Sequence, residues 1–247
     1  MKDNITTFKI LFSALFSIIG SAAPAAVVQT NYSTSDSSIP GGSFVTTNNL
    51  LATNLTSSSH SGSFYTEQTG NWPVVVGRLY DGQLGPNGGE TASGENKTTY
   101  SVMPNTATIQ FDLNGAFDLT EIRTYASWDS GRDAQDYVVK YATSAAPTTF
   151  NILHDLDAFN PPGGNPSSSL VKLTSNSGAL VANVVSLQFE FNGLENGGTG
   201  YREFQISGTS ATAVPEPGTF IPAAVLVAGA ILRRRRSRSH RSGRATA

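Results

Sequence analysis

The 247-residue sequence contains no cysteine and only three histidines. Without cysteine the chain can form no disulfide, perform no thiol catalysis and offer no thiolate to a metal. Its stability must therefore come from a hydrophobic core, a bound metal or partners. Long apolar runs are also absent from its middle, and about 187 residues between the two unusual ends are enough for one domain with a core.

Motifs of the common enzyme classes are missing as well. The sequence holds no Gly-x-Ser-x-Gly, no His-Glu-x-x-His and no phosphate-binding loop. His60 and His154 stand apart without the spacing of metal ligands, and nothing pairs two carboxylates as a glycosidase requires. Asp155 and Asp157 lack the rest of a calcium-binding loop. We therefore predict that the protein is not an enzyme.

The central region has few basic residues. Nine of the 16 Lys and Arg lie in the end segments 1–26 and 214–247, which leaves 7 between them. Only two of the 18 Asp and Glu lie in those ends, which leaves 16 acidic residues and a net charge of about −9 in the middle. Such a charge repels phosphate backbones and attracts cations. We expect no nucleic-acid partner.

The N-terminus has the pattern of a secretory signal. Lys2 and Lys9 flank the apolar residues 10–19, and small residues follow as GSAAPAA. These regions predict a signal peptide over 1–26, forming a signal helix and cleaved between Ala22 and Ala26. A buried helix is the alternative interpretation. The prediction places the middle of the chain outside the cytoplasm.

The C-terminal segment 214–247 combines a short polar motif, an apolar stretch and a basic end. The motif is Val214, Pro215, Glu216 and Pro217, and the basic end begins with Arg233, Arg234, Arg235 and Arg236. Prolines in the tripeptide 215–217 stop a helix from extending upstream, whereas residues 219–232 are expected to form an apolar helix. The arginine-rich end, 233–247, should remain on the cytoplasmic side.

This order of features resembles the PEP-CTERM sorting tail of Gram-negative bacteria. The resemblance implies an exosortase-type processing enzyme as partner. It also implies transient anchoring in the inner membrane, then delivery to the cell surface or the extracellular matrix. An ordinary C-terminal anchor and a nucleic-acid-binding tail are the alternatives.

Alternating apolar and polar residues predict strands through the middle of the chain. The expected strands are residues 72–76, 107–113, 119–126, 137–141, 171–174, 185–191 and 204–206. The remaining segments are a polar N-terminal arm with short strands over 27–71, glycine-rich loops over 84–99 and 161–169, and a linker over 209–213. No long helical period is present, so the pattern favours an all-β sandwich.

The order of these pieces resembles the discoidin, or coagulation-factor type C, group of galactose-binding-like jelly rolls over residues 72–208. The matching pieces are Phe111-Asp112-Leu113, Ile122 with Tyr125, residues 137–141, Arg202-Glu203-Phe204 and the turn Tyr80-Asp81-Gly82. The resemblance implies an eight-stranded jelly-roll β-sandwich with binding loops at one end. The long loops and the absent cysteines depart from the better-known eukaryotic members of this group.

The resemblance also implies a structural Ca²⁺. In some relatives carboxylates of the early turn and the late strand hold the ion together with main-chain carbonyls, and the corresponding residues are Asp81 and Glu203. The alternative is an ordinary turn aspartate and a surface or ion-paired glutamate.

A polar loop between two predicted strands carries a candidate ligand-binding group. It contains Trp128, Asp129, Arg132 and Asp133. An aromatic ring can stack on the C–H face of a sugar while charged groups bind its hydroxyls. The alternative is a core tryptophan and an arginine in a salt bridge.

These features together predict an exported, non-catalytic protein of the cell surface or the extracellular matrix that binds carbohydrate, with extracellular polysaccharide as partner. The alternatives are a hydrolase or lyase acting on polysaccharide and a protein–protein interaction module.

Overall fold

A computed structural model of the chain describes residues 26–34, 48–62, 64–65, 77, 79–82, 100–102, 107–128, 132–161, 167–192 and 198–212. Predictions for residues 1–25, 72–76 and 213–247 lie outside these ranges, so the signal helix and the sorting tail are not described. The chain divides into two units, Met1–Thr209 and Ser210–Ala247, and nearly all described residues belong to the first. Within the described ranges, no helix has the length and apolar character needed to cross a membrane.

The described part of the chain is mostly β-strand, as predicted. Its helix is the four-residue α1 (Leu50–Thr53). Its strands are β1 (Val27–Thr34), β2 (Leu55–Ser61), β3 (Phe64–Tyr65), β4 (Tyr100–Val102), β5 (Ala107–Trp128), β6 (Tyr137–Thr143), β7 (Ala146–Asp155), β8 (Ser167–Ser175), β9 (Val181–Phe191) and β10 (Gly200–Ser210).

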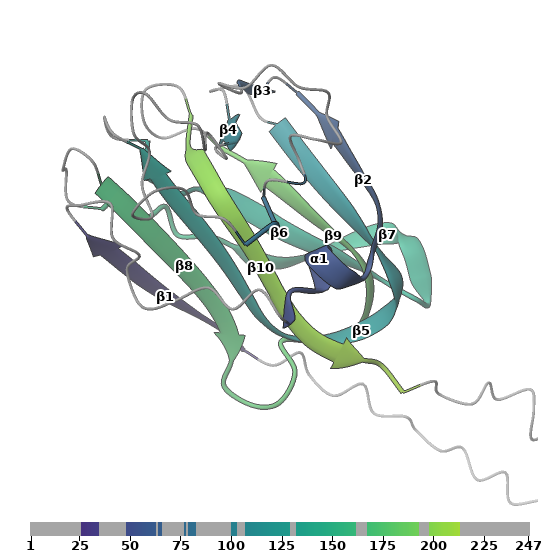
Figure 1. Cartoon of the computed structure of the whole chain (residues 1–247). Coiled ribbons are helices and arrows are strands. Elements are labelled where there is room, and N and C mark those ends of the chain that lie inside the picture. Colours follow the sequence, from purple (N-terminus) through teal and green to yellow (C-terminus); the bar gives the residue numbers. More distant parts are fainter. Residues whose placement is uncertain are drawn as a thin grey trace, which may run out of the picture. The chain divides into compact units, whose positions relative to one another are not determined.

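These strands form one antiparallel sheet that curls into two layers, which is the predicted jelly-roll sandwich (Figure 1). The first half of β5 pairs with β2 on one side and β9 on the other, and β6 and β7 continue that layer. The second half of β5 pairs with β8, which pairs with β1, while β10 and then β4 and β3 continue on its other side. The 22-residue β5 therefore belongs to both layers.

The prediction of two separate strands over residues 107–113 and 119–126 was wrong, because the single strand β5 runs through both ranges. The register with β9 shifts between Asp112 and Phe117, where the strand bends. Gly115 lies at this bend with a φ of +118°, which L side chains rarely adopt. Glycine thus lets the strand turn from one layer to the other without ending.

Three further strand expectations need adjustment. The structure describes ten strands where the family resemblance implied eight. Strand β7 was not predicted, because it is an edge strand whose Pro147, Thr148, Thr149 and Asn151 are exposed and show no alternation. In the segment 27–71, where a polar arm with short strands was expected, β1 and β2 instead pair along nearly their whole lengths with β8 and β5.

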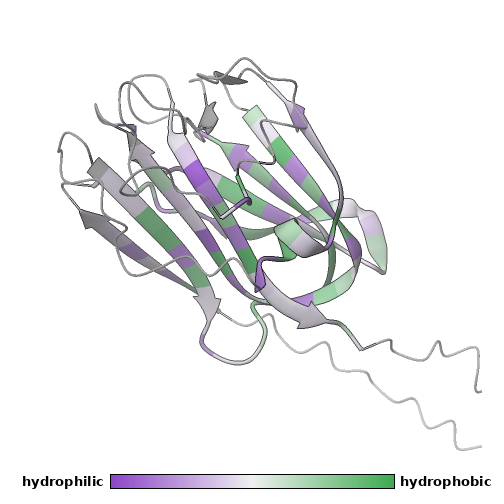
Figure 2. Ribbon diagram, viewed as in Figure 1, coloured by the Kyte–Doolittle hydropathy of each residue, from purple (hydrophilic) through white to green (hydrophobic). Residues whose placement is uncertain are grey.

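The core lies between the two layers and is rich in aromatic rings. The side chains of Phe111, Tyr137, Phe189, Phe191, Tyr201 and Phe204 are all at most 1% exposed. Phe189 of β9 and Phe204 of β10 have ring centroids 5.0 Å apart, so the rings join the two layers directly. Figure 2 shows hydrophilic and hydrophobic residues alternating along the strands. Because successive side chains of a strand point to opposite faces of the sheet, this alternation gives each strand one apolar and one polar face.

Candidate functional site

Three central strands have their ends close together at one end of the sandwich. Trp128, the last residue of β5, pairs with Ser167, the first residue of β8. The first residue of β10, Gly200, donates its N–H to the carbonyl oxygen of Arg132 at 2.7 Å. The end of β5 and the starts of β8 and β10 therefore lie at the same end of the sandwich (Figure 1). Because segments distant in sequence converge here, this end is the candidate binding site.

The backbone at the end of the predicted loop is held by hydrogen bonds from neighbouring segments. The hydroxyl of Ser169 on β8 donates to the carbonyl oxygen of Asp133. The hydroxyl of Thr199, next to β10, donates to the carbonyl oxygen of Ala134. With the bond from Gly200, three successive carbonyls at residues 132–134 are fixed to two strands. A ligand would meet a pre-organised surface, which lowers the entropy lost on binding.

The four residues predicted to bind ligand occupy different environments. Trp128 ends β5 at the loop end, and Asp129 lies outside the described residues. Arg132 is half-buried at the same end, whereas Asp133 is only 2% exposed. The structure thus brings Trp128, Arg132 and Asp133 to one end, with the aspartate carboxyl inside the protein.

Beneath the loop end lies a buried polar floor made of Tyr125, Ser127, Asp133, Ser168 and Arg202, each at most 2% exposed. The Arg202 Nε donates to the carbonyl oxygen of Ser127 at 3.3 Å. Burial raises the pKa of Tyr125 to about 12. Hydrogen bonds with Ser127 and Ser168 and the charge of Arg202 lower this pKa, whereas the charge of Asp133 raises it. Tyr125 therefore remains a neutral phenol between two charged groups. Because all five residues are buried, this network is internal to the fold.

The predicted calcium pair lies farther along β10. The carboxylate of Glu203 is 1% exposed, and its Oε2 accepts a hydrogen bond from the Gly82 N–H at 3.2 Å. Its Oε1 accepts from the Asn49 amide at 3.3 Å. Asp81 is exposed and adjoins Gly82 in the turn. The structure therefore brings the turn that carries Asp81 against Glu203.

The surroundings of Glu203 disfavour the charged form of its carboxyl. Burial raises its pKa to about 9, and the neighbouring charge of Asp81 raises it too, against the lowering effect of the bonds from Gly82 and Asn49. At neutral pH the carboxyl therefore retains a proton unless a cation takes its place.

The residues present fit the calcium that the family resemblance implies, in part. Two neighbouring carboxylates, one of them buried, supply the negative charge that a hard cation prefers. In the described ranges no group of three His, Asp or Glu side chains could hold a metal. Main-chain carbonyl oxygens would have to complete the coordination.

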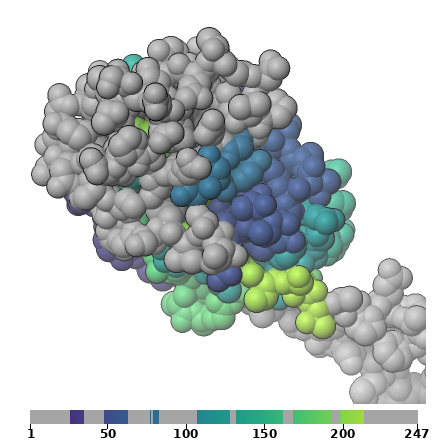
Figure 3. All heavy atoms as spheres, viewed as in Figure 1, coloured from purple at the N-terminus to yellow at the C-terminus, as the bar shows by residue number. Residues whose placement is uncertain are grey.

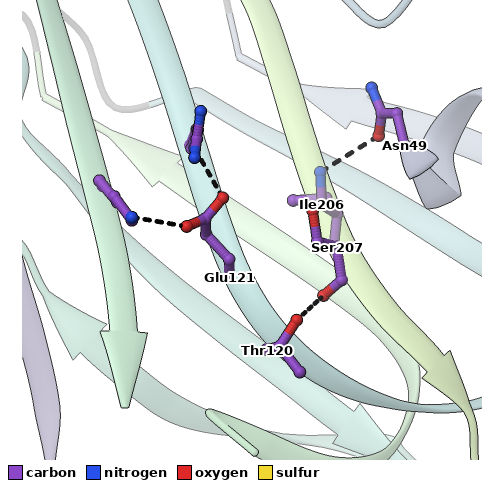
Figure 4. A network of polar contacts seen from close by, with 7 residues as sticks. Asn49, Thr120, Glu121, Ile206 and Ser207 are labelled. Carbon is purple, nitrogen blue, oxygen red and sulfur yellow. Dashed lines mark hydrogen bonds and ion pairs between the residues drawn. The ribbon is translucent and has the colours of Figure 1, made fainter. Parts of the chain in front are cut away.

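The sequence interpretation missed Asn49, which organises this part of the structure. Its side-chain amide donates to Glu203 and, at 2.7 Å, to the carbonyl oxygen of Phe204. Its Oδ1 accepts from the backbone N–H of Leu51, as an N-cap of α1, and from that of Ile206 at 3.1 Å (Figure 4). An asparagine directly before two leucines is a recognisable capping signal. Its reach across to β10 is not visible in sequence.

No family model and no curated protein matches the sequence. Solved structures do match. A chitosan-binding module of a chitosanase/glucanase from Paenibacillus sp. IK-5 is 15% identical with a TM-score of 0.41, and the match covers 64% of this chain and 98% of that one.

Two other matches are also to carbohydrate-binding modules. The CBM32 of AlyQ, solved with 4,5-unsaturated mannuronic acid, is 13% identical with a TM-score of 0.38, covering 62% of this chain and 94% of that one. A pectin-binding module is 15% identical with a TM-score of 0.35, covering 65% and 94%. At these identities the similarity is one of fold.

Proposed function

We propose that this protein is an exported, non-catalytic carbohydrate-binding protein of the cell surface or extracellular matrix. The observation that carries the proposal is the loop end, to which Trp128, the last residue of β5, and Arg132, bonded through its carbonyl oxygen to Gly200 of β10, are both brought. An aromatic residue and a cationic residue at the same end of the fold suit a sugar ring with its hydroxyls. The net charge of about −9 in the middle of the chain favours a neutral over an anionic polysaccharide.

The two ends of the sequence support delivery outside the cytoplasm. The signal pattern over 1–26 would start export, and the tail over 214–247 would hold the chain in the inner membrane until an exosortase-type enzyme acts on it. Intact-mass measurement of the protein recovered from the cell surface tests this step. A mass that retains the tail residues 218–247 would contradict processing.

Calcium binding at Asp81 and Glu203 belongs to the same proposal. The ion would neutralise a buried carboxylate and lock the turn 79–82 onto β10. Its role would be structural, since nothing at this position suggests a reacting group.

Binding to a panel of neutral and charged polysaccharides tests the central proposal. Replacing Trp128 and Arg132 with alanine should weaken retention of the bound polysaccharide about tenfold, which corresponds to about 1.4 kcal/mol. Thr148→Ala, on the exposed edge strand β7, is the control and should bind normally. Binding that survives both loop-end substitutions would contradict the site. Turnover of a polysaccharide would indicate the hydrolase or lyase alternative instead.

A further inference from the structure

A pocket of about 410 Å³ lies beside α1, where β10 approaches its end. It is lined by Asn48, Leu50, Thr53, Thr120, Ser207, Gly208 and Thr209. In Figure 3 the last residues of β10, in yellow, lie directly beside the α1 region, in dark blue, on the surface of the molecule. The volume is within the range of sites that hold small ligands.

The walls of this pocket are fixed by hydrogen bonds and close packing. The Thr120 hydroxyl on β5 donates to the carbonyl oxygen of Ser207 on β10 at 3.3 Å (Figure 4). On the other side, the Thr53 hydroxyl donates to the carbonyl oxygen of Asn49 at 3.2 Å. A Cβ added at Gly208 would lie 2.6 Å from the Asp118 carbonyl oxygen, so β10 approaches β5 here as only glycine allows. The walls of the pocket are therefore positioned by contacts that also hold β10 against β5.

The lining defines a ligand class. The described residues that line it offer hydroxyls, one amide and one leucine, and none of them carries an ionisable group or an aromatic ring. A charged ligand would find no counter-charge, and a flat aromatic ligand would find no ring to stack on. Hydroxyls that already donate, as those of Thr120 and Thr53 do, still accept hydrogen bonds. A neutral molecule bearing many hydroxyls matches this set of donors and acceptors.

The pocket is distant from the loop end. Thr120 and Trp128 lie on the same strand, and eight residues of extended chain span about 26 Å. A ligand of pocket size cannot bridge that distance, so the two places are separate sites.

We propose that this pocket is a second sugar-binding site, specific for a neutral hexose unit, and that it makes the domain bivalent. The ligand class rests on the proposed carbohydrate function, but the site does not share residues with the loop end. Two sites on one rigid body let one protein hold two polysaccharide chains, so it cross-links a matrix instead of merely coating it.

Counting bound oligosaccharides tests the proposal. Calorimetric titration of the purified protein with maltohexaose, cellohexaose and mannohexaose should find two ligands per chain for at least one of them. Thr120→Trp fills the pocket from an exposed strand position and should leave one. Thr148→Trp adds the same ring to an exposed position of β7 and should leave two. Thr120→Val removes only the hydroxyl and should weaken the same site, which guards against misfolding of the bulky variant.

The outcomes separate this inference from the proposed function. A count unchanged by both Thr120 substitutions would overturn the second site and leave the loop end intact. A sugar lost with Thr120→Trp but retained by the loop-end variant Trp128→Ala would support the second site even if the first fails. No binding of any of the three oligosaccharides would overturn the second site. Cross-linking has its own readout: the unaltered protein should raise the viscosity of the bound polysaccharide, and Thr120→Trp should not.

Discussion

The backbone N–H of Gly82 donates to the buried carboxylate of Glu203 at 3.2 Å, although the two residues are 121 positions apart in sequence. This bond docks a tight turn against the last strand and places the charge of Asp81 beside a carboxyl that water does not reach. Two ionised carboxylates in this arrangement would repel each other. The repulsion is relieved when one of them takes up a proton or when a cation binds to both.

Calcium should therefore stabilise the protein. We expect the melting temperature to rise on adding calcium and to fall on adding chelator, because an ion that binds only the folded state adds to its stability. Differential scanning calorimetry measures the shift. Glu203→Gln and Asp81→Asn should abolish the response, whereas Asp155→Asn, at an exposed position of β7, should preserve it. Equal melting temperatures with calcium and chelator would contradict the site.

The pH dependence in chelator has a defined sign. Folding raises the pKa of Glu203 from 4.5 to about 9, so between these values the folded protein keeps a proton that the unfolded chain has released. The free energy of unfolding should fall as the pH rises through this window, by up to about 1.4 kcal/mol per pH unit. Urea unfolding at about pH 5, 7 and 8.5 measures the slope.

Two further measurements check the same group. Glu203→Gln should flatten the pH slope, because the amide does not titrate. Apparent calcium affinity should increase with pH across the window, since the ion must displace the proton. A slope of the opposite sign in the unaltered protein would show that another group dominates.

The aromatic core should be sensitive to truncation. Phe189 is fully buried, and its ring contacts those of Phe111, Tyr137 and Phe204. Phe189→Ala should cost about 3–5 kcal/mol of unfolding free energy, from lost burial and the cavity left behind. Ile152→Ala is the control, since that side chain is 64% exposed and should change stability by less than about 0.5 kcal/mol. Similar losses for both would mean that the layers do not meet at Phe189.

The stability of the fold should depend on glycine at position 208. An alanine Cβ would lie 2.6 Å from the Asp118 carbonyl oxygen and 3.1 Å from the Leu119 Cα, and both are backbone atoms that cannot rotate away. Gly208→Ala should destabilise the fold by about 1–3 kcal/mol. Gly77→Ala, where nothing lies within 4 Å, provides the comparison and should be nearly neutral. Chemical unfolding of the two variants side by side gives the difference.

The sequence predicted the sandwich because its central strands have a buried and an exposed face. Residues 107–113 and 185–191 alternate cleanly, and both lie within strands that pair with each other. Strand β7 lacked this signal because it packs little surface against the core. The continuity of β5 was missed because Asn114-Gly115 is a usual turn signal, and only the pairing on both sides of this dipeptide shows that the strand continues.

The sequence could predict only those candidate sites whose residues belong to recognisable local motifs. Asp81 and Glu203 could be named because family resemblance ties each to a local motif, and the bond from Gly82 brings the two motifs together. The pocket beside α1 could not be named, because Thr53, Thr120 and Thr209 are ordinary polar residues that only the fold assembles.

Strand β5 also has a consequence for when the domain can fold. Its partners are β2, which precedes it, and β8, β9 and β10, which all follow it in sequence. Neither layer can be completed until the chain has been synthesised beyond β9 and β10. Pairings so distant in sequence form slowly, on a scale of about milliseconds to seconds. The strand that joins the layers thus delays folding until β10 has been synthesised, and the growing chain lacks a completed sandwich until then.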